Sequence, residues 1–153
     1  MTVDQNIFPT IQGENLERQR FILPQDLQGV KNVLLVAFQQ WHQTLVDSWA
    51  GPLGQLIVDR SDVYVYEIPV LPRINPLGRF FIDGAMRRAI PSRQVRETTI
   101  TVYLDREQLI KQLDIPNFDT IVPMIVQPDG RILWRGQGGY EAKQFSELKE
   151  VLE

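Results

Sequence analysis

The stretch NVLLVAFQQWHQTL, residues 32–45, decides the fold that the sequence predicts. Its first seven residues form a nearly continuous apolar run rich in valine and leucine, which is typical of a short strand buried on both faces. Such strands occupy the centre of α/β sheets. After the strand, apolar residues recur at spacings of three and four as far as about Asp59, which is the periodicity of an amphipathic helix. We expect Gly51 and Pro52 to kink that helix.

The rest of the chain alternates between predicted strands and helices. Residues 63–70 (VYVYEIPV) are rich in β-branched and aromatic residues, which is typical of a strand that Pro69 ends or makes irregular. Asn75 and Pro76 predict the start of a helix, with asparagine as the N-cap and proline at the first helical position. The remaining predicted elements are a helix over 75–89, a strand over 98–104, a short helix over 105–113, a hairpin over 121–135 and a last helix over 140–152.

This order of elements fixes the expected fold class. Strands that alternate with helices predict a parallel core, and the C-terminal hairpin adds antiparallel pairing at one side. The fold class is therefore α/β, with a four- or five-stranded mixed sheet and helices on both faces. The 153 residues suit one domain, 1–153, in which residues 1–15 form a loosely ordered N-terminal extension.

The chain contains no cysteine and a single histidine, His42. The absence of cysteine removes the thiol nucleophile, disulfide exchange and cysteine-ligated metals, and on this ground we exclude thiol-disulfide oxidoreductase and peroxidase activity. A single histidine argues against a histidine-rich metal site, and no carboxylate pair suits glycosidase or metal chemistry. We therefore expect no catalytic residues, no metal, no cofactor and no enzymatic activity.

Charge is unevenly distributed along the chain. The formal net charge is −3, from 16 Lys and Arg against 19 Asp and Glu, so no nucleic-acid partner is expected. Residues 70–97, however, hold six arginines and only two acidic side chains, which makes a local positive patch. The six are Arg73, Arg79, Arg87, Arg88, Arg93 and Arg96.

The sequence also predicts where the protein resides. No window approaches the ~20 apolar residues that a membrane span requires. The start MTVDQN lacks the charged and apolar regions of a signal peptide. We expect a soluble protein of the bacterial cytoplasm or of an organellar matrix or stroma, and peripheral association with an anionic membrane remains an open alternative.

The order of elements, with a hairpin and a helix at the C-terminus, resembles the thioredoxin fold. Residues 13–41 (GENLERQRFILPQDLQGVKNVLLVAFQQW) are similar to the opening of peroxiredoxin-like and TlpA-like proteins. In thioredoxins the strand is followed by Trp-Cys-x-x-Cys. Here Trp41 is followed by His-Gln-Thr-Leu, so His42 and Leu45 fill both cysteine positions. The resemblance implies the fold and, with both thiols replaced, no thiol-disulfide activity.

A closer resemblance covers residues 16–152. The segments VAFQQWHQTLVDSW, VYVYEIPVLPRINPLGRFFIDGAMRR, RETTITVYLDREQLIKQLDI and DGRILWRGQG are similar, in order and spacing, to the mitochondrial F-type ATP synthase assembly factors of the "ATPase complex subunit ten" family. Members of that family also lack the paired cysteines. The resemblance implies a redox-inactive, chaperone-like protein that binds a protein partner, such as an ATP synthase subunit, and helps a membrane complex to assemble.

The candidate interaction residues are Trp41, His42, Arg79, Phe80, Arg87 and Arg88. His42 follows a strand and precedes a helix, where unpaired amides depress an imidazole pKa and favour an anion. This position gives an alternative function, a small-molecule- or anion-binding protein or enzyme that uses His42. The plainer interpretation is a surface or capping histidine. Trp41, in the loop, is the better candidate for an interface, whereas Trp49 lies on the apolar stripe and is expected in the core.

The arginine-bearing helix leaves three interpretations open. Arginines beside Phe80 and Phe81 suit an anionic lipid surface or an acidic protein partner. Arginine also contacts phosphate or carboxylate groups through two hydrogen bonds at once. The third interpretation is a solvated helix face whose charges pair with nearby acidic residues.

Overall fold

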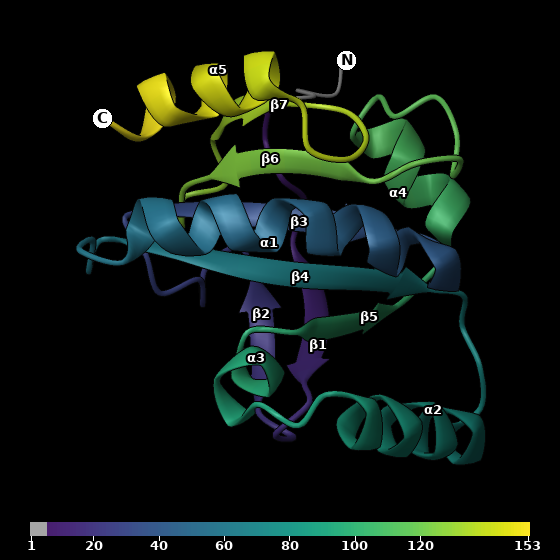
Figure 1. The fold of residues 1–153 in the computed structure, drawn as a ribbon. Coiled ribbons are helices and arrows are strands. Elements are labelled where there is room, and N and C mark those ends of the chain that lie inside the picture. The colour runs from purple at the N-terminus through teal and green to yellow at the C-terminus, as the bar shows by residue number, and fades with distance from the viewer. Residues whose placement is uncertain (1–5) are drawn as a thin grey trace.

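A computed structural model of the chain describes residues 6–153 (Figure 1). The strands are β1 (Ile11–Asn15), β2 (Arg20–Leu23), β3 (Lys31–Ala37), β4 (Val63–Leu71), β5 (Ile100–Tyr103), β6 (Val122–Val126) and β7 (Ile132–Arg135). The helices are α1 (Gln43–Ile57), α2 (Pro76–Ala89), α3 (Arg93–Glu97), α4 (Arg106–Gln112) and α5 (Ala142–Leu152), and a 3-10 turn, η1 (Gln40–His42), precedes α1.

The seven strands belong to one mixed sheet in the order β2-β1-β5-β4-β3-β6-β7. β3, the strand predicted from residues 32–38, pairs in parallel with β4 and antiparallel with β6. β4 and β5 are parallel, whereas β1, β2 and β7 pair antiparallel with their neighbours. The predicted α/β class and mixed sheet are confirmed, although the sheet has seven strands instead of four or five.

The N-terminal segment differs from the predicted loose extension over residues 1–15. β1 and β2 form an antiparallel hairpin, in which Glu14 lies opposite Arg20, and β1 also pairs with β5. Before β1, Phe8 is buried and its N–H donates to the carbonyl of Gly130 at 2.7 Å. The expectation of a loose extension is therefore wrong for residues 6–15. The strand was not recognised because polar side chains on one of its faces hide the pattern of alternating apolar residues. Residues 1–5 lie outside the described part of the chain.

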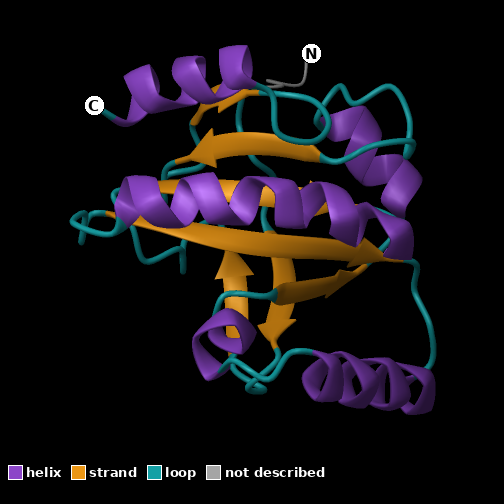
Figure 2. Cartoon of the chain, viewed as in Figure 1, coloured by secondary structure: helices purple, strands orange, loops and turns teal. Residues whose placement is uncertain are grey.

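Helices cover both faces of the sheet, as predicted (Figure 2). On one face, Leu35 of β3 packs in a cluster with Trp49 of α1 and Leu148 of α5. On the other face, Leu34 of β3 belongs to a second cluster that includes Leu109 of α4. Because successive strand side chains point to opposite faces, β3 contributes to both clusters, which explains its nearly continuous apolar sequence.

α2 is packed differently from the other long helices. Its N-cap is the predicted one: Oδ1 of Asn75 accepts the N–H of Gly78 at 2.8 Å, and Pro76 occupies the first position. None of its residues is buried, however. Figure 1 shows α2 apart from α1, near the ends of β1 and β5. The start of α2 is therefore fixed by local sequence signals, the Asn75 cap and Pro76. Its apolar face is not packed tightly against the rest of the protein.

Other details qualify the predicted elements. α1 passes through Gly51 and Pro52 as one helix. β4 continues through Pro69, which lies opposite Ala37, so the predicted end of the strand is not found there. α3 was not predicted; the Ser92 hydroxyl caps it by accepting a backbone N–H. Within residues 6–153, no helix is both long and apolar enough to cross a bilayer.

Candidate functional site

One face of the sheet at β1, β2 and β5 is polar. Ile100 and Val102 of β5 point into the apolar core, so Thr101 and Tyr103 point to the opposite face. Pairing of Glu14 with Thr101 and Arg20 puts side chains from all three strands on that same face. The face consists of Gln12, Glu14, Arg20, Ile22, Thr101 and Tyr103. An apolar helix stripe cannot pack tightly on such a surface.

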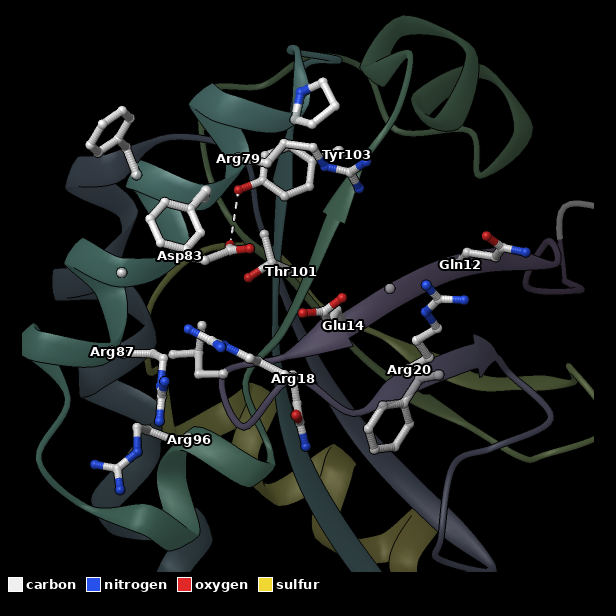
Figure 3. A pocket seen from close by; sticks show the side chains of 18 of the residues that line it. Gln12, Glu14, Arg18, Arg20, Arg79, Asp83, Arg87, Arg96, Thr101 and Tyr103 are labelled. Carbon is white, nitrogen blue, oxygen red and sulfur yellow. Dashed lines mark hydrogen bonds between the residues drawn. The ribbon is translucent and has the colours of Figure 1, made fainter.

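α2 stands over this face and encloses a cavity, which we call the α2 pocket. The cavity has a volume of about 1170 Å³ and is bounded by α2, the β1–β2 hairpin, β5 and Arg96 of α3. Figure 3 shows Arg79, Asp83 and Arg87 of α2 on one side, and Glu14 and Arg20 on the other. The polar sheet face thus explains both the open space and the exposed position of α2.

Part of the positive patch predicted from residues 70–97 lines this pocket from the side of α2 and α3. Four of its six arginines line the cavity, namely Arg79, Arg87, Arg88 and Arg96. Sequence reasoning missed Arg18 and Arg20, which reach the same cavity from the β1–β2 hairpin. It also missed Thr101 and Tyr103. The signal that could have found them was the alternation of polar and apolar residues in β5, whose polar positions face the pocket.

A tyrosine holds the first turns of α2 against β5. The Tyr103 hydroxyl donates to Oδ1 of Asp83 at 3.0 Å, and the Arg79 guanidinium lies 4.4 Å from the centre of the Tyr103 ring. Burial raises the pKa of Tyr103, the Asp83 carboxylate raises it further, and Arg79 opposes the shift. Tyr103 is therefore a neutral donor that fixes the position of Asp83 in the wall of the pocket.

Glu17, in the β1–β2 turn, ties the hairpin to α2 and α3. Its carboxylate accepts a hydrogen bond from Nε of Arg96 at 2.7 Å and lies 3.7 Å from Nη2 of Arg87. Arg96 also donates to the carbonyls of Ile90 and Pro91 in the α2–α3 linker. The hydrogen bond from Arg96 lowers the pKa of Glu17, and the charges of nearby arginines lower it further. These contacts hold the far end of α2 in place.

His42 lies in the protein interior, outside the α2 pocket. It is fully buried, and its Nδ1 accepts the N–H groups of Phe38 at 3.0 Å and Gln39 at 3.3 Å. Burial lowers the pKa of His42, while the backbone of Asp119 acts in the opposite direction. The ring is therefore a neutral acceptor that shapes the turn after β3, and an anion at a surface-exposed His42 does not fit this geometry.

The two tryptophans near this turn have different environments. Trp41 is 55% exposed and touches the edge of His42, at 4.5 Å between ring centres. Trp49 is fully buried, as expected. The structure therefore does not gather the six candidate residues into one site: Arg79, Phe80, Arg87 and Arg88 line the α2 pocket, whereas Trp41 and His42 do not.

Metal-binding side chains are not grouped in the described chain. Among residues 6–153, no three histidine, aspartate or glutamate side chains lie close enough together to hold a metal ion. The pocket instead offers guanidinium, hydroxyl and aromatic groups, which suit an organic anion better than a cation.

Glu67, on β4 beside α1, has an altered acidity outside the pocket. Burial raises the pKa of its carboxyl group, the Asp47 carboxylate raises it further, and a hydrogen bond from Gln43 opposes the shift. The native pKa thus lies above the unfolded value of 4.5. As the pH rises from 4.5 toward the native pKa of Glu67, the unfolded chain releases the proton of this carboxyl group before the folded chain does, so the free energy of unfolding falls.

We therefore expect Glu67→Gln to stabilise the protein at pH 7. The amide cannot ionise, so the thermal midpoint should rise by about 2–4 °C, the shift that a change of about 1 kcal/mol produces in a chain of this size. Calorimetry between pH 4 and pH 8 measures it. Glu150→Gln, at an exposed position, is the matched control. A midpoint that is lower for Glu67→Gln than for the parent protein at pH 7 would show that the ionised carboxylate is stabilising.

Comparison with known proteins identifies the fold. No protein-family model matches the chain, and no curated protein sequence matches it. Among solved structures, it is similar to the thioredoxin domain of a thiol-disulfide oxidoreductase from Bacteroides vulgatus, with 13% identity, 100% of both chains covered and a TM-score of 0.59. It is also similar to the exposed lipoprotein thioredoxin Etrx1 of Streptococcus pneumoniae (12% identity, 93% and 98% covered, TM-score 0.57). Copper-bound ScoI of Arabidopsis thaliana is a third (10%, 95% and 98%, TM-score 0.61).

These likenesses confirm the thioredoxin-like fold and correct one expectation. We expected no enzymatic activity because the chain has no cysteine, yet the fold is shared with a protein named as a thiol-disulfide oxidoreductase. The expectation that the protein is not an enzyme is therefore wrong, because it was drawn from the composition alone. The chain itself supplies no thiol, so thiol chemistry would require sulfur from another molecule. The resemblance to ATP synthase assembly factors is not shown by these comparisons and stays a prediction.

Proposed function

We propose that this thioredoxin-like protein binds another protein through α2 and acts as an assembly or chaperone-like factor for a membrane complex. One observation carries the proposal: α2 buries none of its residues, and Leu77, Phe80 and Phe81 are 65%, 62% and 64% exposed. Large apolar side chains gathered on one exposed surface mark a site of interaction with another molecule.

The exposed apolar residues share one face of the helix. Leu77, Phe80 and Phe81 are spaced three and four residues apart, which brings them together on an α-helix. The two phenylalanine rings are in edge contact, with 6.1 Å between their centres. Arg88 lies seven residues beyond Phe81 and is exposed. This face combines aromatic anchors with a cation, the residue types enriched in protein interfaces.

The position of the arginines favours a protein partner over a lipid surface. A helix that lies on a membrane places cations along the borders of its apolar face. Here Arg79 lies over Tyr103 and Arg87 lies near Glu17, so both turn toward the pocket. The charges that a membrane contact needs are thus partly used within the protein.

F-type ATP synthase is the client that we propose first. The sequence resemblance over residues 16–152 supports this choice. Membrane subunits of such a complex expose apolar segments before they assemble, and an amphipathic helix with free aromatic side chains can cover such a segment. The same contact would serve any membrane complex whose subunits pass through a similar exposed state.

The proposal predicts a loss of function from α2 variants that still fold. In a host strain lacking the gene, the double variant Phe80→Ser, Phe81→Ser should fail to restore the amount of assembled ATP synthase on native gels. The wild type should restore it. Because both rings are exposed, the variant's free energy of unfolding should stay within about 0.5 kcal/mol of the parent value.

Val58→Ser is the matched control, because Val58 is 76% exposed and follows α1. It should restore assembly like the wild type. Unchanged assembly in the deletion strain would remove ATP synthase as the client. Full restoration by the Phe80, Phe81 double variant would remove α2 as the contact surface.

A further inference from the structure

Two buried polar atoms in the walls of the α2 pocket have no hydrogen-bond partner among residues 6–153. They are Nε of Arg87, on α2, and Oγ1 of Thr101, on β5. Thr101 is only 3% exposed. Buried polar groups are normally paired with protein, water or a bound ligand, because leaving them unpaired is unfavourable. Two such groups that line one cavity, from the helix and from the sheet, mark a polar binding site.

The charges around these atoms specify an anion. Six arginines line the pocket, against the carboxylates of Glu14 and Asp83. Arg96 is engaged by Glu17. The side chains of Arg18, Arg20 and Arg88, by contrast, form no ion pair or hydrogen bond with the described residues. Guanidinium groups bind planar or tetrahedral oxyanions through paired N–H donors, and several uncompensated ones favour a dianion.

The pocket has room for more than the anionic group. Its volume of about 1170 Å³ exceeds what one phosphate or carboxylate fills, since small-molecule sites occupy roughly 300–1,000 Å³. Phe21, Ile22 and Phe80 line it beside the charged side chains. A ligand with an anionic group at one end and an apolar or aromatic body would match both the charged and the apolar side chains that line the pocket.

We propose that the α2 pocket binds an organic phosphate, a phosphate group carried on an apolar body, with Nε of Arg87 and Oγ1 of Thr101 as donors to the phosphate oxygens. Arg18, Arg20 and Arg88 supply the surrounding positive charge. This site goes beyond the proposed function: its phosphate donors lie on α2 and β5, whereas the partner surface is formed by Leu77, Phe80 and Phe81, of which the two phenylalanines also line the pocket.

Phenyl phosphate is the probe, and isothermal titration calorimetry at low salt is the measurement. The wild type should bind it saturably and more tightly than inorganic phosphate, which lacks the apolar body. Arg87→Lys keeps the charge but removes the Nε donor, and it should weaken binding about tenfold or more. Thr101→Val keeps the shape and removes the hydroxyl, and it should weaken binding by about tenfold.

Two readouts separate this site from general charge attraction and from misfolding. Arg93→Lys changes an arginine that is 77% exposed and does not line the pocket, so it should bind phenyl phosphate like the wild type. Without ligand, Thr101→Val should not lower the thermal midpoint, because the hydroxyl it removes has no partner among the described residues. Absence of saturable binding by the wild type at millimolar phenyl phosphate, or equal weakening by Arg93→Lys, would overturn the proposal.

The phosphate could be that of a soluble molecule or of a lipid headgroup, and vesicles distinguish these sources. Sedimentation with phosphatidylcholine vesicles, with and without phosphatidic acid, tests the lipid. Binding that requires phosphatidic acid and is lost in Thr101→Val would support the same site with a lipid as its ligand. Vesicle binding that Thr101→Val and Arg87→Lys leave unchanged, with no binding of phenyl phosphate, would contradict it.

Discussion

Trp49→Ala is expected to lower the free energy of unfolding by about 3–5 kcal/mol, the range for removing a buried tryptophan. Trp49 is fully buried between α1 and the sheet. Its ring is in edge contact with those of Trp134 and Tyr140, at 6.5 Å and 5.6 Å between centres. Its Nε1 donates to the carbonyl of Gly138 at 2.9 Å. The side chain therefore joins α1, β7 and the loop before α5, and its loss leaves a cavity and an unpaired carbonyl.

Urea unfolding followed by circular dichroism measures this effect. Trp41→Ala is the matched control, because Trp41 is 55% exposed and its loss should change the free energy of unfolding by no more than about 0.5 kcal/mol. A loss of less than about 1 kcal/mol for Trp49→Ala would contradict the packing described here. The pair also checks the expectation that Trp49 is a core residue and Trp41 a surface residue.

His42→Ala is expected to cost about 3 kcal/mol of stability, because two backbone N–H groups then lose their acceptor in a buried place. Those groups belong to Phe38 and Gln39, at the end of β3. His42→Asn places an amide oxygen near the position of Nδ1 and should recover a large part of the loss. Equal losses for the two variants would show that the ring's volume, and not its acceptor, is what matters.

The same histidine predicts how stability depends on pH. Burial lowers the pKa of His42 below its ordinary value of 6.5. The unfolded chain therefore takes up a proton first as the pH falls, so stability is present above pH 6.5 and is lost as the pH falls from 6.5 toward the native pKa. In His42→Asn this dependence should disappear. An unchanged slope between pH 5 and pH 7 in His42→Asn would assign the effect to other groups.

Much of the fold could be predicted because its signals are local. The continuous apolar sequence of β3, the Asn75 and Pro76 start of α2 and the Asp129-Gly130 turn of the hairpin each act within a few residues. β1 was missed because its five residues, IQGEN, do not show the alternation of apolar and polar residues that marks a strand. One face carries Gln and Glu, and the other carries Ile, Gly and Asn. Its strand conformation depends on pairing with β2 and β5, which are distant in sequence or weakly marked themselves.

The candidate site could be predicted only in part. The arginine-rich segment drew attention to α2, and four of its arginines do line the pocket. The alternation in β5 marks Thr101 as a residue on the polar face, but its position opposite Glu14, like that of Arg20, depends on the register of β1 with its two neighbours, which the sequence does not reveal. His42 was predicted in part. The alternative of an exposed anion site at the start of a helix does not fit, because the turn folds the ring inward. The interpretation as a capping histidine agrees with the structure, in which Nδ1 accepts backbone N–H groups.

The proposed contact through α2 can be observed directly in host cells. A photo-crosslinking phenylalanine analogue placed at position 81 should form adducts with a subunit of a membrane complex, ATP synthase first among them. The same analogue at position 58, where Val58 is 76% exposed against 64% for Phe81, should not. Adducts from position 81 that are absent or no more specific than those from position 58, or that contain only lipid, would contradict the claim that α2 binds a protein partner.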